Sequence, residues 1–254
     1  HLMQPSFSKR FFAMLILSLA VGPTSAEELI VSAAASLTTA FKALGPVFEA
    51  QHPGTKVLFN FAASDALVQQ IAKGAPVDVF ASADQEAMDK AQTQQLLASG
   101  TRKNFVGNSL VLIVPADSKL TIATIADLTQ TAVTRIAIGN PASVPVGRYT
   151  KQALEQNKLW SAMEPKAILA QSVRQGLDYV ARGEVDAGFV YNTDATILKT
   201  KVRVVATVPT EKAILYPIAA IASSQHSEMA RQFVDFTLST DGQALLAQFG
   251  FLKP

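Results

Sequence analysis

Residues 30–37 read IVSAAASL, a short apolar strand that runs into small residues and ends at Ser36 and Leu37. From Leu37 onward, apolar side chains recur at three- and four-residue spacing, which predicts an amphipathic helix. Ser36 is therefore expected to cap this helix, because a serine oxygen can accept from a free backbone N–H group of the first turn. Such a helix start also attracts anions through its unpaired N–H groups and its dipole.

One motif of this kind is more often a plain helix cap than a binding site, but the chain repeats it. Ser64 follows a predicted strand over residues 55–61 and two alanines, and a helical pattern begins after it. Val146 follows a proline, which is typical of the first helical position because proline has no N–H group to leave unpaired. Val173 follows Ser172, which we expect to cap a further helix. The repetition favours an anion-binding site built from several helix starts.

Predicted strands and helices alternate along the chain, which indicates an α/β fold with largely parallel sheets. The apolar strand predicted over residues 214–221 contains Pro217. Proline cannot donate to a neighbouring strand, so this strand is expected at a sheet edge or at a crossover.

The first 26 residues have the pattern of an export signal. Lys9 and Arg10 form a basic region, residues 11–21 are apolar, and the small residues 24–26 resemble a cleavage site. His1 and Leu2 precede the first methionine and are interpreted as a cloning remnant. The apolar run is too short for a stable membrane anchor. We therefore expect a soluble mature protein that begins at Glu27.

Composition excludes several classes of function. Residues 1–26 carry two of the 22 basic side chains and none of the 20 acidic ones, so the rest of the chain has no net charge. A neutral chain without basic runs argues against nucleic acid or an anionic membrane surface as a partner. The chain contains no cysteine, which excludes disulfides, thiolate metal sites and a lipid-modified cysteine. An exported protein without an anchor is most easily retained in the periplasm of a Gram-negative cell.

Six motifs in chain order resemble those of the periplasmic molybdate-binding proteins of molybdate ABC importers. They are AAASL at 33–37, FAAS at 61–64, GAPVDVFASAD at 74–84, GNSL at 107–110, VPVG at 144–147 and GFVYNTDA at 188–195. The resemblance implies a two-lobed, hinge-bending (type II) binding protein, each lobe a mainly parallel sheet flanked by helices. It places two hinge crossovers near residues 108–110 and 213–217. Lobe one is then 27–108 plus 217–254, and lobe two is 109–216.

The resemblance also implies how the ligand is held. A tetrahedral oxyanion, molybdate or tungstate, would contact the hydroxyl and amide groups of Ser36 and Ser64, the amides of Val146 and Val173, and the hydroxyl of Tyr191. Four of these residues are also predicted helix starts, and four helix dipoles of about half a charge each suit a dianion. Tyr191 rests on the resemblance alone. No cofactor, free metal ion or catalytic residue is expected, and the implied partners of this presumed monomer are the oxyanion and the membrane permease.

Three charged residues adjoin these positions. Asp65 follows Ser64, and we expect its carboxylate to point away from the cleft, where it would otherwise repel the ligand. Arg148 and Arg174 each lie close after a predicted ligand residue and are interpreted as solvated arginines at the rim. Replacing either arginine by glutamine is therefore expected to change affinity little.

Other functions remain open at this point. A sulfate or other oxyanion-binding protein would have the same donors, and cavity size would have to separate the anions. A serine hydrolase would need a base, but beyond the signal region the chain has only His52 and His226, in turn-like segments, and no G-x-S-x-G motif. The sensing domain of a transcription regulator can share this fold, but the export signal argues against it.

Overall fold

The computed structural model describes residues 22 and 25–254 of the 254-residue chain. The predicted signal peptide, residues 1–26, thus lies almost entirely outside the described residues. Within the described part of the chain, no helix is both long and apolar enough to cross a membrane.

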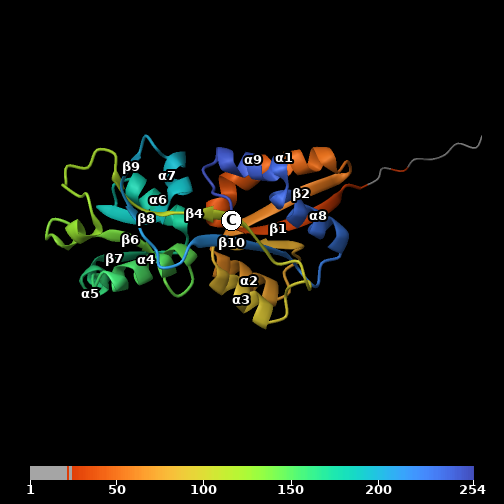
Figure 1. Cartoon of the computed structure of the whole chain (residues 1–254), viewed down its shortest axis with the longest axis horizontal. Coiled ribbons are helices and arrows are strands. Elements are labelled where there is room, and N and C mark those ends of the chain that lie inside the picture. The colour runs from red at the N-terminus through yellow and green to blue at the C-terminus, as the bar shows by residue number, and fades with distance from the viewer. Residues whose placement is uncertain (1–21, 23–24) are drawn as a thin grey trace, which may run out of the picture.

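Two five-stranded sheets lie side by side (Figure 1). The first has the order β2-β1-β3-β10-β4 and consists of β1 (Glu27–Ala34), β2 (Thr55–Ala62), β3 (Val79–Ala81), β4 (Lys103–Asn108) and β10 (Ile214–Ala220). The second has the order β7-β6-β8-β5-β9 and consists of β5 (Leu110–Pro115), β6 (Ile136–Gly139), β7 (Ala167–Ala170), β8 (Ala187–Tyr191) and β9 (Val202–Val208). In each sheet four strands run in one direction and one runs against them, β10 in the first and β5 in the second. The predicted α/β fold with two mainly parallel sheets is confirmed.

Helices cover both faces of each sheet, as parallel strands require. Those of the first sheet are α1 (Thr38–Gln51), α2 (Ser64–Ala72), α3 (Gln85–Thr93), α8 (Ser227–Leu238) and α9 (Thr240–Gln248). Helices α1, α8 and α9 lie on one face, and α2 and α3 lie on the other (Figure 1). Those of the second sheet are α4 (Pro145–Gln156), α5 (Trp160–Met163), α6 (Val173–Ala181) and α7 (Asn192–Ile197).

The chain passes between the two sheets twice. Strand β4 leads into β5 with only Ser109 between them, and β9 leads into β10 through residues 209–213. Residue 217, where the sequence prediction divided the chain, lies within β10, which pairs with β4 from Ile214 onward. The second passage therefore lies a few residues earlier than predicted. We call residues 27–108 with 214–254 lobe one, and residues 109–213 lobe two.

Of the two positions expected for the strand with Pro217, a sheet edge or a crossover, β10 occupies the second. The strand directly follows a passage between lobes, but it pairs on both sides, with β3 and with β4. The register with β4 shifts between Tyr216 and Pro217. Such a bulge disrupts the ladder locally, so that a residue without an N–H group is tolerated in an inner strand.

Candidate functional site

A small cavity lies between the two lobes. It is lined from lobe one by Ala34, Ala35, Ser36, Ala63, Ser64 and Ala83, and from lobe two by Val144, Pro145, Val146, Val173 and Tyr191. The cavity is small, so it suits a compact ligand rather than an extended one. Every side chain in this lining is uncharged at neutral pH.

The structure brings all five predicted ligand residues together at this cavity. Each is at most 5% exposed, so a ligand held there would be removed from bulk water. They come from five separate segments of the chain and from both lobes. Their contact with a ligand stays a prediction.

Ser36 and Ser64 differ from prediction in local geometry. A 3₁₀ turn (Ala35–Leu37) precedes α1, and Ser36 lies inside it. Ser64 is the first residue of α2, and Ala63 occupies the cap position. The prediction that Ser36 caps its helix is therefore wrong, and Ser64 lies inside α2 rather than before it: each helical segment begins one or two residues before the expected point. Because neither hydroxyl is used on its own helix, both are available elsewhere.

The two serine hydroxyls form hydrogen bonds with other parts of lobe one. The backbone N–H of Ala83 donates to Ser64 Oγ at 3.0 Å. Ser36 Oγ lies 2.8 Å from Tyr216 Oη on β10. Tyr216 is the partner that the sequence analysis missed, because a tyrosine in an apolar strand pattern gives no signal of such a role.

Tyr191 is the lining residue whose hydroxyl lacks a partner. Its side chain is 1% exposed, and its Oη finds no hydrogen-bond partner among the described residues. Buried hydroxyl groups are nearly always hydrogen-bonded, so an unpartnered one at a cavity points to an acceptor in that cavity. Burial, reinforced by the neighbouring Tyr216, raises the pKa of Tyr191 well above its usual value, so the hydroxyl keeps its proton.

Lobe two contributes two helix starts. Pro145 is the first residue of α4 and Val146 the second, and Ser172 caps α6 by accepting from Gln175 N–H at 3.1 Å. The predicted cap at Ser172 is confirmed. N–H groups in the first turn have no partner within their own helix. Since Val146 and Val173 have apolar side chains, any polar contact that they make in the cavity comes from their backbone.

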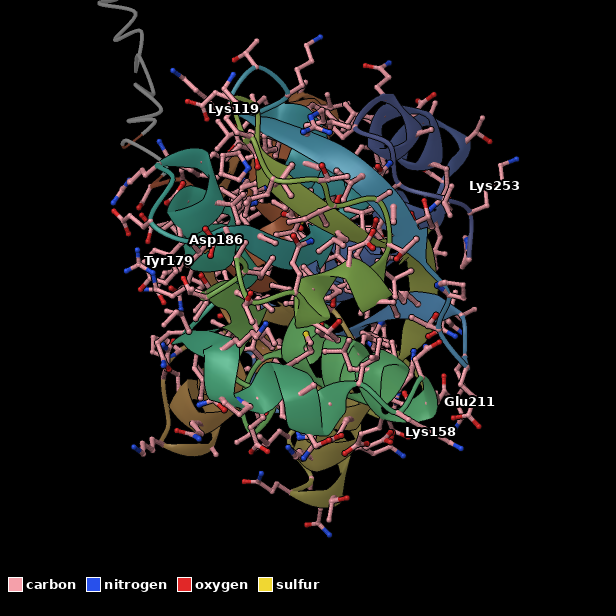
Figure 2. The ribbon with its side chains drawn as sticks, turned by 90° about the vertical axis from the view of Figure 1, so that its left-hand side faces the viewer. Lys119, Lys158, Tyr179, Asp186, Glu211 and Lys253 are labelled. Carbon is pink, nitrogen blue, oxygen red and sulfur yellow. The ribbon has the colours of Figure 1, made fainter. Side chains whose placement is uncertain are left out.

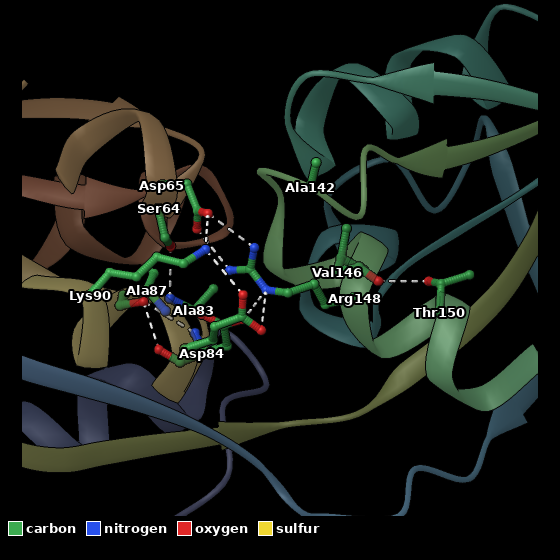
Figure 3. A network of polar contacts seen from close by, with 12 residues as sticks. Ser64, Asp65, Ala83, Asp84, Ala87, Lys90, Ala142, Val146, Arg148 and Thr150 are labelled. Atoms are coloured by element: carbon green, nitrogen blue, oxygen red, sulfur yellow. Dashed lines mark hydrogen bonds and ion pairs between the residues drawn. The ribbon is translucent and has the colours of Figure 1, made fainter. Parts of the chain in front are cut away.

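Arg148 connects the two lobes and is not the solvated rim residue that the sequence predicted. Its side chain is 13% exposed. Its guanidinium donates to Asp65 Oδ1 at 2.7 Å and to Asp84 Oδ2 at 2.7 Å, both in lobe one (Figure 3). Lys90 also reaches Asp65 Oδ2 at 2.9 Å. We call Arg148, Asp65, Asp84 and Lys90 the inter-lobe ion cluster.

The cluster also corrects the expected orientation of Asp65, whose carboxylate turns toward lobe two instead of away from it (Figure 3). Burial alone would raise the pKa of Asp65, but the hydrogen bonds from Arg148 and Lys90 outweigh it, so that this pKa is lowered. Asp84 has two roles, because its Oδ1 caps α3 at Ala87 N–H while its Oδ2 binds Arg148. The carboxylates beside the cavity are thus paired with cations.

Arg174 forms a second connection between the lobes. Its Nε donates to the fully buried Asp194 at 2.7 Å, and its terminal nitrogens reach Ser36 O and Thr39 Oγ1 in lobe one, each at 3.3 Å. Its side chain is 22% exposed, so it too differs from the predicted rim residue. Burial raises the pKa of Asp194 to about 6, although the ion pair with Arg174 opposes this shift. Neither arginine lines the cavity.

A two-lobed α/β chain with a small, uncharged, donor-rich cavity between its lobes defines a solute-binding protein of the type II class. The comparison with known families agrees: residues 29–252 match the family of bacterial extracellular solute-binding proteins, and the chain belongs to it. Members of this family bind and deliver solutes and are not enzymes.

Individual relatives resemble the chain over most of its length. The molybdate-binding protein ModA of Escherichia coli K12 is 37% identical, over 94% of this chain and 96% of its own. The substrate-binding domain assigned to a molybdenum ABC transporter of Clostridium difficile is also 37% identical, covers 89% of this chain and 99% of its own, and superposes with a TM-score of 0.69. The periplasmic molybdate-binding protein of Azotobacter vinelandii, 24% identical over 89% of this chain and 99% of its own, superposes with a TM-score of 0.76 and supports the fold.

Proposed function

We propose that this protein binds molybdate in the cavity between its lobes and delivers it to an ABC importer. The observation that carries the proposal is the buried, unpartnered hydroxyl of Tyr191 in a cavity whose lining contains no ionised side chain. Such a hydroxyl requires an acceptor, and an oxyanion supplies one. The relatives that are named molybdate-binding proteins support the choice of anion.

Helix starts supply the positive potential in this proposal. The N-termini leading to α1, α2, α4 and α6 all meet the cavity, through Ser36, Ser64, Val146 and Val173. With about half a unit charge each, they offset a charge of about −2. Tungstate has nearly the size of molybdate and should bind as well. Sulfate has the same charge and shape, so the cavity radius must separate it from molybdate.

The cellular setting follows from the sequence pattern and the family. The export-signal pattern at residues 1–26 supports a location in the periplasm of a Gram-negative cell, and we propose that the protein acts there as an unanchored monomer. The partner is the membrane permease of the importer. The two passages at Ser109 and residues 209–213 act as a hinge, and the lobes close over the anion.

Calorimetric titration with molybdate, tungstate, sulfate and phosphate in parallel tests the proposal. We expect molybdate and tungstate to bind tightly and phosphate to bind weakly. Absence of molybdate binding would contradict the proposed function, and a clear preference for sulfate would reassign the ligand within the same class.

The serine hydroxyls provide a residue-level test. Ser36→Ala and Ser64→Ala should each weaken molybdate binding about ten- to a hundredfold, because a hydrogen bond to a charged group contributes roughly 1.5–3 kcal/mol. Ser239→Ala is the matched control: Ser239 caps α9 by accepting from Gly242 N–H, away from the cavity. That variant should lose some stability and keep its affinity. Unchanged affinity in both cavity variants would mean that the ligand lies elsewhere.

A further inference from the structure

Asn108 ends β4 at the first passage between the lobes, and three hydrogen bonds fix its carboxamide. Its Oδ1 accepts from the backbone N–H of Ser109 at 2.9 Å. Its Nδ2 donates to Thr193 Oγ1 at 2.9 Å and to Tyr216 Oη at 3.2 Å. Because a backbone N–H can only donate, the oxygen of the carboxamide must face Ser109 and the nitrogen must face Tyr216.

The direction of the next hydrogen bond follows from this orientation. Tyr216 is fully buried and carries one hydroxyl proton. Since Asn108 donates to Tyr216 Oη, that proton is free for Ser36 Oγ, 2.8 Å away. The reverse direction would leave the Tyr216 proton buried without an acceptor, which is the costly arrangement. Burial raises the pKa of Tyr216 well above its usual value, so the hydroxyl stays protonated.

Ser36 is left with its own proton and no acceptor in this chain of bonds. Ser36 lines the cavity, so that proton is available to a ligand there. Ser64 is in the same situation, because its oxygen accepts from the Ala83 N–H while its own proton has no acceptor among the described residues. A free serine could rotate and accept a hydrogen bond from a protonated ligand. Here each hydroxyl already accepts one bond from the protein, and its own proton has no acceptor in the described part of the chain, so each faces the ligand as a donor.

We propose that Asn108 and Tyr216 are positioning residues that fix Ser36 as a hydrogen-bond donor, so that the cavity discriminates against oxyanions carrying a proton. The inference rests on the proposed oxyanion-binding function and adds the residues that determine its selectivity. Where a protonated oxyanion such as hydrogen phosphate places its O–H group against Ser36 or Ser64, that O–H group meets a donor and loses its partner on leaving water. A fully deprotonated anion has acceptors on every side.

We call the hydrogen bonds from Asn108 to Tyr216 and from Tyr216 to Ser36 the relay. Tyr216→Phe tests it, because phenylalanine keeps the ring and removes only the hydroxyl. The readout is competition: inorganic phosphate displaces bound molybdate at neutral pH, where phosphate carries a proton, and the ratio of the two affinities is measured. Without the bond from Tyr216, the Ser36 hydroxyl can rotate and accept from phosphate. The preference for molybdate over phosphate should fall by about tenfold, the effect of one ordinary buried hydrogen bond. A merely structural role of Tyr216 would weaken both anions alike and leave the ratio unchanged.

Asn108→Asp provides an independent test by reversing the relay. A carboxylate accepts where the amide nitrogen donated, so Tyr216 would donate to residue 108 and accept from Ser36. The oxygen of Ser36, rather than its proton, would then face the cavity. Molybdate affinity should fall more than in Tyr216→Phe, and the ratio should again move toward phosphate. Equal losses for both anions would reflect the added negative charge alone and would overturn the inference.

Tyr179→Phe is the matched control, because Tyr179 lies on the outer face of lobe two (Figure 2), far from the relay in the fold. It should keep its affinity for both molybdate and phosphate.

Thermal melting establishes that each variant is folded. If Tyr216→Phe does not fold, Asn108→Asp alone tests the inference. Wild-type protein that fails to bind molybdate would contradict the proposed function. Wild-type protein that binds it, with an unchanged ratio in the relay variants, would contradict only the inference.

Discussion

Replacing Arg148 by glutamine tests whether the inter-lobe ion cluster contributes to ligand affinity. In the closed arrangement, Arg148 donates to Asp65 and Asp84 at 2.7 Å each, and the side chains of both carboxylates are at most 7% exposed. When the lobes separate, these carboxylates can regain water. Removing the arginine therefore disfavours mainly the closed form, in which two neighbouring carboxylates would remain without their shared cation.

The contacts set the size of the effect. Removing one partner of a buried ion pair costs about 3–5 kcal/mol. Two features reduce this cost here. Lys90 still reaches Asp65, but its side chain is 43% exposed, and a pair at such a position contributes at most about 1 kcal/mol. The glutamine that replaces Arg148 can donate one hydrogen bond to the carboxylates. A net loss of about 2 kcal/mol in closure remains. Because the anion binds the closed form, the affinity should fall by roughly thirtyfold.

The assay combines calorimetry with small-angle scattering. Molybdate should reduce the radius of gyration of the wild-type protein, and Arg148→Gln should need more molybdate for the same reduction. Arg182→Gln is the control, since Arg182 in the same lobe is 66% exposed and reaches Glu184 only at 3.8 Å. An affinity for Arg148→Gln within threefold of wild type would refute the reasoning and mean that the inter-lobe ion cluster does not contribute to ligand affinity.

Two further predictions concern folding. Gly147→Ala should destabilise the protein by about 1–3 kcal/mol in urea unfolding, because a Cβ there would overlap the backbone oxygen of Gly139, whereas Gly176→Ala meets only Ala170 Cβ at 3.6 Å and should be tolerated. Burial raises the pKa of Asp194 to about 6, so the folded protein holds the carboxyl proton of Asp194 more tightly than the unfolded chain does. The stability that Asp194 contributes should therefore fall as pH rises from about 4 through about 6. Asp194→Asn should remove this part of the pH dependence in thermal melts. Equal stability of the two glycine variants, or an unchanged pH profile in Asp194→Asn, would contradict these assignments.

Local patterns were enough to predict the elements that form the cavity. The alternation of strand, small residues and helix placed Ser36, Ser64, Val146 and Val173 at helix starts, and all four line the cavity. The same patterns could not fix the geometry within one turn. Whether a chain enters a helix through a 3₁₀ turn, as at Ser36, depends on packing against other segments that local propensity does not report.

Long-range pairing explains what the sequence left undetermined. Arg148 has the sequence context of an exposed helical residue, and its partners Asp65 and Asp84 lie 83 and 64 positions away. Tyr191 and Tyr216 both occur in apolar strands, and nothing in either strand distinguishes a tyrosine that faces a ligand from one that orients a serine. The resemblance to molybdate-binding proteins indicated Tyr191, and no sequence signal indicated Tyr216.

The arrangement of charges allows the control of lobe closure to be separated from the control of anion selectivity. Ionised side chains pair with one another outside the cavity, Arg148 across the lobes and Arg174 within lobe two, while uncharged side chains line it. The inter-lobe ion cluster acts on closure, so Arg148→Gln should weaken molybdate, tungstate and sulfate by the same factor. The relay through Tyr216 acts on a single donor, so its variants should change the ratio between deprotonated and protonated anions. A substitution at Arg148 that altered this ratio would mean that its guanidinium also acts on the ligand, and closure and selectivity would then depend on the same group.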